Sequence, residues 1–252
     1  MPLAGLRERL RARSPTTVAF LDLGSPTSAE VTAMSGFDVV VVDLEHGAGD
    51  EAAARAQITA AQPHAHVVVR VPEGPAQAGR MLDAGADGVI VPQVASPEQA
   101  ESAADAVRYA GAGRGISPLS RGNRFGADPQ WRERADARIA CIVQIERASA
   151  LEGVEEIAAL PEVDALLMGP ADLSNDLGVA LDLDGDALRD AARRVADAAV
   201  QNGKTAALHL ARAEQAPDFA GLGFTMLSCT FETAVLAARS RAAGEALRAA
   251  FR

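Results

Sequence analysis

The chain has 252 residues, a formal net charge of −10, and a composition that is 48% hydrophobic but only 4% aromatic. This length accommodates one large domain whose core is built from small aliphatic side chains. The negative charge argues against nucleic acids and anionic membrane surfaces as partners. We find no signal peptide and no apolar run long enough to span a membrane, so we predict a cytoplasmic protein in which Cys141 and Cys229 are buried thiols.

Strand-like and helix-like segments alternate along the chain. Continuous β-branched runs, such as residues 39–42, are typical of strands buried on both faces of a parallel sheet. We predict strands at residues 17–21, 39–42, 66–71, 88–91, 139–143, 165–168, 205–208 and 223–228. We predict helices at residues 5–13, 27–35, 50–61, 76–84, 97–110, 129–136, 148–160, 184–202, 211–220 and 231–251.

An internal echo supports a repeated strand–helix unit. The tripeptides Gly-Phe-Asp, Gly-Ala-Asp and Glu-Val-Asp precede the strands that begin at Val39, Gly88 and Ala165. Repetition without a domain-splitting linker predicts that residues 1–252 form a single (β/α)8 barrel of the TIM type. A doubly wound open sheet is the alternative, although no G-x-G-x-x-G motif follows the first strand.

A long loop interrupts the alternation. Residues 111–126 contain five glycines together with Arg114, Arg121 and Arg124. Loops of this length in compact domains are usually functional or disordered. Two interpretations stay open: a lid whose arginines close over an anionic substrate, or a solvated surface loop.

Polar side chains gather where the predicted strands end. In a barrel, the carboxyl ends of all strands meet at one mouth, where active sites lie. His209 lies just past a strand and is also expected to approach this mouth. The other residues predicted to converge there are Asp43, Glu45, His46, Arg70, Gln93, Gln144, Glu146, Gly169, Pro170, Ala171 and Asp172.

Two of these residues, Glu146 and Asp172, are carboxylates that follow consecutive strands. Mg²⁺ and similar hard cations are commonly bound by one or two carboxylates, with water and substrate oxygens completing the coordination. We therefore predict a divalent metal site. The alternative is a salt bridge or, for Asp172, a helix N-cap.

A base and a carboxylate clamp are predicted beside the metal. His46 lies close in sequence to two carboxylates, and a carboxylate on one ring nitrogen raises the basicity of the other. Arg70 can hold a substrate carboxylate bidentately. The alternatives are a surface histidine and an internal pair between Arg70 and Glu45. Backbone N–H groups at residues 169–172 can receive a further carboxylate.

This equipment suits the enolisation of a 2-oxo acid, because a cation would chelate the carboxylate and keto oxygens and stabilise the enolate. No lysine lies at a predicted strand end, since Lys204 precedes its strand. This absence argues against a Schiff-base aldolase.

The same residues stand in stretches that resemble the HpcH/HpaI family of metal-dependent class II pyruvate aldolases. The matching stretches include GFDVVVVDLEHG, VVVRVP, MLDAGADGVIVPQVASPEQA and VQIERASALEGVEEIAALPEVDALLMGPADLSNDLG. The resemblance implies a hexamer built as a trimer of dimers, in which the last helix is swapped between the subunits. The segment Leu227-Ser228-Cys229-Thr230-Phe231 departs from the Gly-x-Asp common in the family, which affects mainly the expected aldehyde partner.

The resemblance also implies roles for individual residues. Glu146 and Asp172 would bind Mg²⁺, Mn²⁺ or Co²⁺, and Arg70 would contact pyruvate and its enolate oxygen. His46, assisted by Asp43, would act as acid and base through a metal-bound water. Gln144 would line the site, the backbone of Gly169, Pro170, Ala171 and Asp172 would hold the pyruvate carboxylate, and Asp83 would reach a neighbouring subunit's site.

The leading hypothesis is a lyase that cleaves a 4-hydroxy-2-oxo acid to pyruvate and an aldehyde, and that runs in reverse as an aldolase. Three alternatives stay open. They are C–C cleavage of a CoA thioester, as in citrate-lyase-β-like relatives, decarboxylation of a 2-oxo diacid, and a ligand-binding barrel without turnover.

Overall fold

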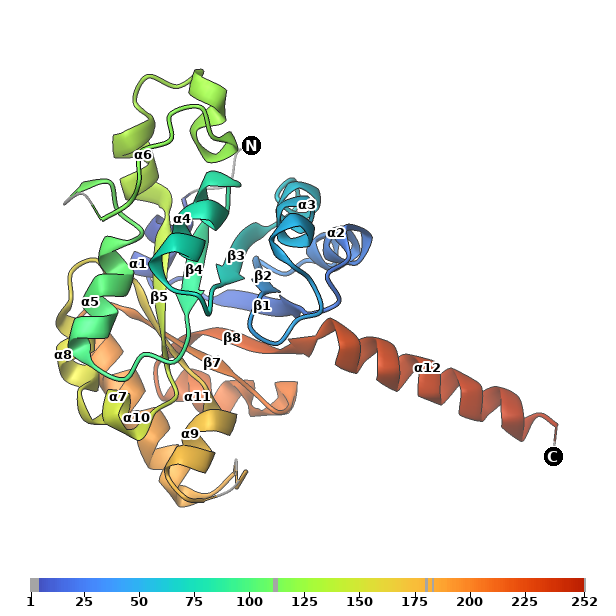
Figure 1. Cartoon of the computed structure of the whole chain (residues 1–252). Helices are drawn as coiled ribbons and strands as arrows, with labels where there is room; N and C mark the ends of the chain where they lie inside the picture. The colour runs from blue at the N-terminus through green and yellow to red at the C-terminus, as the bar shows by residue number, and fades with distance from the viewer. Residues whose placement is uncertain (1–4, 111–112, 180, 183, 252) are drawn as a thin grey trace.

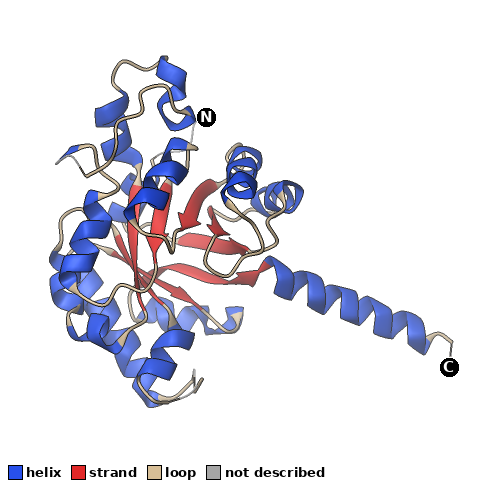
Figure 2. Cartoon of the chain, in the orientation of Figure 1, coloured by secondary structure: helices blue, strands red, loops and turns tan. Residues whose placement is uncertain are grey.

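A computed structural model describes residues 5–110, 113–179, 181–182 and 184–251. Parallel strands β1 to β8 form a closed barrel in sequence order, and β8 pairs with β1 (Figure 1). Figure 2 shows the strands at the centre with helices around them. The predicted (β/α)8 barrel is therefore confirmed.

The strands lie close to their predicted positions. They are β1 Thr16–Leu21, β2 Val39–Asp43, β3 His66–Arg70, β4 Gly88–Val91, β5 Ala140–Ile145, β6 Ala165–Met168, β7 Thr205–His209 and β8 Phe224–Phe231. The last strand continues three residues beyond the predicted end at Ser228. The extension is anchored by Phe231, whose ring packs on Phe20 and His209.

The helices surround the barrel. They are α1 Leu6–Arg11, α2 Pro26–Met34, α3 Glu51–Ala61, α4 Pro75–Asp83, α5 Pro97–Asp105, η2 Arg121–Gly126, α6 Trp131–Arg138, α7 Ala148–Glu152, α8 Val154–Ala159, α9 Pro170–Asp176, α10 Asp186–Gln201, η3 Ala213–Gln215, α11 Ala216–Gly221 and α12 Glu232–Ala249. The single helix predicted at residues 148–160 is wrong, because Gly153 leaves the helical conformation and separates α7 from α8. The helix predicted at residues 97–110 ends early, at Asp105, and the carboxylate of Asp136 accepts the N–H groups of Tyr109 and Ala110.

Two apolar layers hold the barrel together. Alternate residues of a strand face opposite sides of the sheet. In β2, Val39 and Val41 belong to the cluster inside the barrel. Val40 and Val42 belong to the second cluster, between the barrel and the helices around it. Every residue of β2 is buried, which explains the continuous β-branched run.

The repeated aspartates have a structural role. Asp38, Asp87 and Asp164 each precede an even-numbered strand, and each accepts a hydrogen bond from a main-chain N–H near the start of the preceding odd-numbered strand. The donors are the N–H groups of Thr17, Val67 and Cys141, at 2.9, 3.0 and 3.0 Å. A buried main-chain donor needs such a partner. The sequence echo therefore marks the amino-terminal end of the barrel.

The cysteines differ in their surroundings. Both are free thiols, which agrees with the prediction that they form no disulfide. Burial raises the pKa of Cys141 to about 12, which keeps this thiol protonated and inert. Cys229 is exposed, so the prediction of a buried thiol is wrong there. Thr230 and Cys229 lie where β8 runs beyond the barrel's packed interior.

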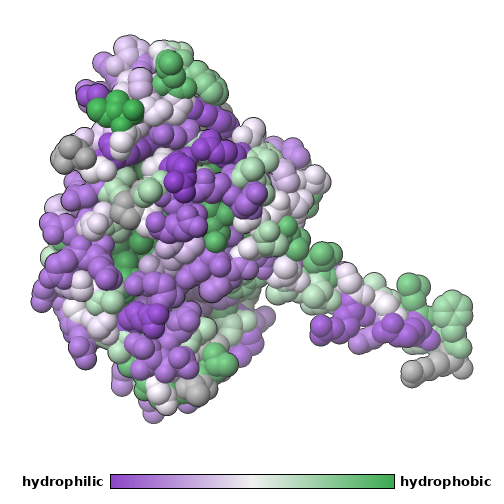
Figure 3. All heavy atoms as spheres, in the orientation of Figure 1, coloured by the Kyte–Doolittle hydropathy of each residue, from purple (hydrophilic) through white to green (hydrophobic). Residues whose placement is uncertain are grey.

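The C-terminal helix α12 extends away from the barrel (Figure 1). Its large apolar side chains Val235, Leu236 and Leu247 are exposed, and Figure 3 shows hydrophobic atoms along this helix. Hydrophobic surface left open in this way commonly marks a protein–protein interface. No described helix is long and apolar enough to cross a membrane.

Asp164 is the most heavily paired carboxylate at the amino-terminal end. It is fully buried and accepts from Arg7, Arg11 and Arg108 at 3.0, 3.1 and 2.8 Å. Asp164→Asn is expected to lower the free energy of unfolding by about 3–5 kcal/mol, because buried guanidinium groups lose their counter-ion. Urea denaturation checks this, with the exposed Asp190→Asn as control. A change as small as that of the control would contradict the role assigned to Asp164.

Candidate active site

A cavity of about 230 Å³ opens at the carboxyl ends of the strands. It collects residues from seven separate parts of the chain, as the sequence predicted for a barrel mouth. Its lining comprises Phe20, His46, Arg70, Gln144, Leu167, Met168, Gly169, Pro170, Ala171, Asp172, His209 and Phe231. Of the residues predicted to meet at the mouth, His46, Arg70, Gln144, residues 169–172 and His209 line this cavity, whereas Asp43, Glu45, Gln93 and Glu146 do not.

Arg70, at the end of β3, is the cation of this cavity. Its Nε and Nη2 donate to the two oxygens of Asp43 at 2.8 and 2.6 Å, and its Nη1 lies 3.1 Å from Glu45 Oε2. The guanidinium carbon lies 5.5 Å from the ring centre of Phe20. Arg70 thus pairs with internal carboxylates and also faces the cavity, two arrangements that the sequence left compatible with each other.

Asp43 organises the loop that carries His46. Its Oδ1 accepts from the main-chain N–H groups of Glu45 and His46 at 3.0 and 3.3 Å. The pKa of Asp43 is lowered: burial acts to raise it, but the hydrogen bonds and the charge of Arg70 outweigh burial. Asp43 therefore contacts the main chain of His46 and not its ring in this structure.

The His46 ring stands at the rim, with 64% of its side chain exposed. Its Nε2 lies 3.9 Å from Glu45 Oε2, so Glu45 is the nearest carboxylate. This arrangement leaves the ring free to meet a substrate. The assistance of His46 by Asp43 stays a prediction, and in this geometry it acts through the loop.

Glu146 is 1% exposed and lies against Gln144 and Gly169, two residues that line the cavity. Its Oε1 accepts from the main-chain N–H of Gln93 at 2.6 Å, and its Oε2 accepts from the side-chain amide of Gln144. Burial raises the pKa of Glu146, and the negative charges of Glu45 and Asp172 add to this effect. A cation would relieve the repulsion among these carboxylates.

The donor set fits a hard divalent cation. Glu146 and Asp172 supply two carboxylates, and Mg²⁺ typically takes one or two, with water or substrate oxygens in the other positions. No group of three or more His, Cys, Asp or Glu residues that could hold a metal occurs in the described part of the chain. A Cβ on Gly169 would come within 2.9 Å of Glu146 Oε2, so only glycine fits against this carboxylate. The buried Gln144 Oε1 has no hydrogen-bond partner.

His209 is a wall of the cavity, as expected from its place after a strand. Its Nδ1 lies 3.1 Å from Ser228 Oγ, and its ring packs edge-on against Phe20. Burial and the nearby charge of Arg70 lower the pKa of His209 to about 4, so the ring is neutral near pH 7. Phe20 and Phe231 were missed by sequence reasoning, because an aromatic residue in a strand gives no sign of which cavity it lines.

The long loop does not cover the mouth of its own barrel, so the lid interpretation is wrong within one chain. Arg121 donates to Gln62 Oε1 at 2.5 Å and to the Ala84 carbonyl at 3.1 Å, both at the amino-terminal end. Asp83 ends α4 at the same end and pairs with Arg114 at 2.9 Å. Residues 111–112 of the loop lie outside the described residues.

Comparison with known proteins decides the family. The family model of HpcH/HpaI aldolase/citrate lyase matches residues 16–238. The chain belongs to this family. It is therefore an enzyme that acts as a carbon–carbon lyase, and its named relatives are aldolases.

Curated relatives and a solved structure agree with this assignment. A hydroxypyruvate/pyruvate aldolase of Paraburkholderia phytofirmans is 37% identical over 88% of this chain and 90% of its own length. A 4-hydroxy-2-oxo-heptane-1,7-dioate aldolase of Shigella boydii is 31% identical over 96% and 92%. The crystal structure of an HpcH/HpaI aldolase/citrate lyase family protein from Burkholderia cenocepacia superposes with a TM-score of 0.90, at 31% identity over 96% of this chain and 98% of that one.

The buried pair of Asp43 and Arg70 gives a prediction about acid stability. Asp43→Asn should lower the free energy of unfolding by about 3–5 kcal/mol near neutral pH, because Arg70 stays buried without this carboxylate. The folded pKa of Asp43 lies below its ordinary value of 3.8, so the stability that Asp43 contributes is present above that value and is lost as pH falls through the folded pKa.

Urea denaturation from about pH 7 to about pH 3 measures this difference. The difference in free energy of unfolding between wild type and Asp43→Asn should become smaller in acid. The exposed Asp197→Asn serves as the control and should change little at any pH. A gap that stays constant over the whole range would contradict the proposed charge pairing.

Proposed function

We propose that the protein is a divalent-metal-dependent aldolase that cleaves a 4-hydroxy-2-oxo acid to pyruvate and an aldehyde, and that also forms this bond. The observation that carries the proposal is the convergence of His46, Arg70 and Asp172 on one cavity, whose lining residues Gln144 and Gly169 contact the buried Glu146. The names of the relatives, which are pyruvate and 4-hydroxy-2-oxo acid aldolases, support the same substrate class.

Glu146 and Asp172 would hold the divalent cation, Mg²⁺, Mn²⁺ or Co²⁺. When bound, it would act as a Lewis acid toward the keto group of the substrate. The raised pKa of Glu146 supports this placement, because burial and the charges of Glu45 and Asp172 disfavour its ionised form, which a bound cation would stabilise.

Arg70 has donors left for the substrate. A guanidinium carries five N–H groups, and the contacts with Asp43 and Glu45 engage one on each nitrogen. One N–H on each terminal nitrogen can therefore donate to the keto oxygen as negative charge develops there. Because both carboxylates hold the guanidinium in place, little reorganisation is needed when the charge appears.

The first turn of α9 would bind the substrate carboxylate. The first N–H groups of a helix have no intrahelical acceptor, and Pro170 at the start of α9 has no N–H. The N–H groups of Ala171 and Asp172 remain, and both residues line the cavity. Gln144 lies beside them and would orient the same end of the substrate.

His46 would move the proton. Its exposed ring can take the proton from the 4-hydroxyl group as the C3–C4 bond breaks, and can return it in the direction of synthesis. The neutral His209 with Phe20 and Phe231 forms an uncharged wall, against which the aldehyde portion would lie.

The helix α12 would pack against a neighbouring subunit. Its exposed Val235, Leu236 and Leu247 support this, because an isolated chain leaves them in water. We propose the swapped helix and the hexamer, a trimer of dimers, that the family resemblance implies. In such an assembly Asp83, which lies far from the mouth of its own barrel, would approach the site of a neighbour.

Variants test the proposed roles. His46→Ala and Arg70→Lys should each lower kcat/KM by about 100-fold or more, because each removes a group that acts in the transition state. The assay follows pyruvate released from a panel of 4-hydroxy-2-oxo acids with Mg²⁺, Mn²⁺ or Co²⁺, and EDTA should abolish it. Arg80→Lys is a matched control, since Arg80 forms an exposed ion pair with Glu51 on the barrel's outer helices.

Circular dichroism would show whether each variant keeps the fold. No pyruvate from any acid, or a rate that survives EDTA, would exclude the proposed reaction. Wild-type rates in folded His46→Ala and Arg70→Lys would exclude the residue roles while leaving the reaction possible.

A further inference from the structure

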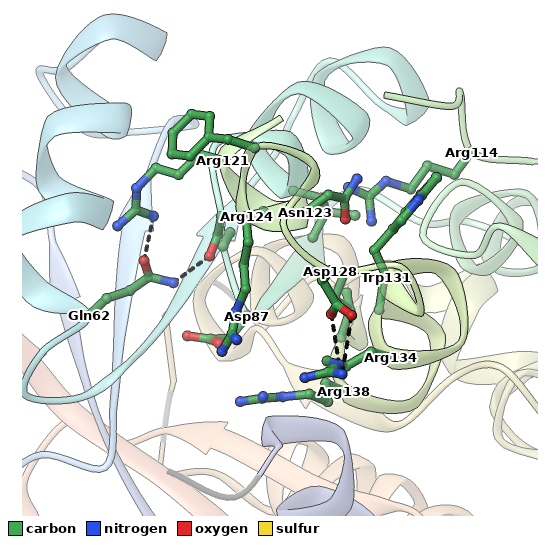
Figure 4. A pocket seen from close by; sticks show the side chains of 17 residues that line it. Gln62, Asp87, Arg114, Arg121, Asn123, Arg124, Asp128, Trp131, Arg134 and Arg138 are labelled. Carbon is green, nitrogen blue, oxygen red and sulfur yellow. Dashed lines mark hydrogen bonds and ion pairs between the residues drawn. The ribbon is translucent and has the colours of Figure 1, made fainter. Parts of the chain in front are cut away.

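A second cavity, of about 500 Å³, lies at the amino-terminal end of the barrel. It is bounded by the end of α4, by η2 and by α6 (Figure 4). Asp87 and Ile139, which immediately precede β4 and β5, line its floor. The active site lies at the opposite ends of these strands, so the two cavities are separate.

The cavity is basic in an acidic protein. Five arginines line it, namely Arg114, Arg121, Arg124, Arg134 and Arg138, against the two carboxylates Asp87 and Asp128. The whole chain carries a formal charge of −10, so this excess of positive charge is a local feature. An anion would be attracted to it, since a cavity lined by one sign of charge concentrates its field.

Two of the arginines, Arg121 and Arg124, have no carboxylate partner in the described part of the chain. Arg134 pairs with Asp128 at 2.9 Å, but Arg121 donates only to uncharged oxygens, those of Gln62 and Ala84. The side chain of Arg124 forms no hydrogen bond or ion pair within the described ranges, and the residue takes a left-handed conformation with φ of 55°. Figure 4 shows Arg121, Arg124 and Arg134 reaching the cavity from different sides.

Arg114 is the strongest indication of a ligand. Its side chain is 1% exposed and its guanidinium lies 4.3 Å from the ring centre of Tyr109. Only Nη2 is paired, with Asp83, whereas the buried Nε and Nη1 have no hydrogen-bond partner among the residues that the structure describes. Leaving buried charged donors unsatisfied is costly. The positive charge of Arg114 adds to the attraction of the adjoining cavity for an anion.

We propose that this cavity binds a small phosphate-bearing anion. Guanidinium groups match the oxygens of phosphate, and several of them around one space suit a ligand with more than one negative charge. The volume exceeds that of a single phosphate, and the Trp131 and Phe125 side chains add apolar surface for the rest of such a molecule.

Trp131 makes the site directly observable. It is the only tryptophan of the chain and it lines the cavity, so its fluorescence reports binding there. The full-length protein is titrated with pyrophosphate at constant ionic strength, in EDTA so that no divalent cation is present. A saturable change in Trp131 emission is expected. Arg124→Gln should weaken the apparent affinity by about tenfold or more, since it removes the unpaired cation.

Two variants serve as controls. Arg193→Gln removes the same charge from the exposed face of α10 and should leave the affinity unchanged. Arg70→Lys, at the catalytic mouth, should also leave it unchanged. Arg114→Gln should weaken binding as Arg124→Gln does, and a thermal scan shows whether that variant folds. Arg124 is exposed, so its variant keeps the proposal testable if Arg114→Gln does not fold.

Several outcomes would overturn the proposal. They are the absence of any saturable signal, an equal loss of affinity in Arg193→Gln, and unchanged affinity in Arg124→Gln. A response to citrate with none to pyrophosphate would contradict the phosphate assignment. One further outcome would identify a neighbouring subunit, and not a phosphate, as the occupant of the cavity. In that outcome pyrophosphate has no effect, dilution into monomers opens the cavity, and Arg124→Gln shifts the oligomeric state.

Discussion

The bidentate contact between Arg70 and Asp43 is the constraint on which the catalytic mouth depends. The two residues are register partners at the ends of β2 and β3, so the barrel itself brings them together. Both side chains are buried, and the parallel hydrogen bonds offset the cost of taking the charges out of water. Asp43 then holds the loop of His46, and Arg70 holds Glu45. This one contact thereby positions Arg70 as the clamp, His46 as the base and Glu45 as the carboxylate nearest to His46.

The two ends of the barrel have opposite electrostatic character. At the carboxyl end, burial and the nearby negative charges of Glu45 and Asp172 raise the pKa of Glu146, which favours a cation. At the amino-terminal end, Asp164 is saturated by arginines, while Arg114 and Arg124, which line the cavity at that end, remain short of acceptors among the described residues. The net charge of −10 describes neither end. Ligand preferences are therefore set locally, by which charges the strands and loops leave unpaired.

Sequence reasoning succeeded where the strand order alone decides position. A continuous run such as that of β2 shows a strand buried on both faces, and polar residues that follow such strands must meet at one mouth, as His46, Arg70 and Gln144 do. It failed where tertiary contacts decide. Sequence spacing could not show whether Asp43 contacts the ring of His46, because Arg70 competes for the same carboxylate. The path of residues 111–126 depends on the contacts of Arg121 with Gln62 and of Arg114 with Asp83, which no local pattern encodes.

Proton exchange at the methyl group of pyruvate tests the central claim most directly, because enolisation requires no knowledge of the aldehyde. Pyruvate in heavy water is followed by proton NMR with the metal-loaded protein. The account predicts that the methyl signal decays with wild type, and that the decay stops with EDTA and slows strongly in Arg70→Lys. A methyl signal that persists with metal-loaded wild type, or a decay that continues unchanged in EDTA, would contradict it.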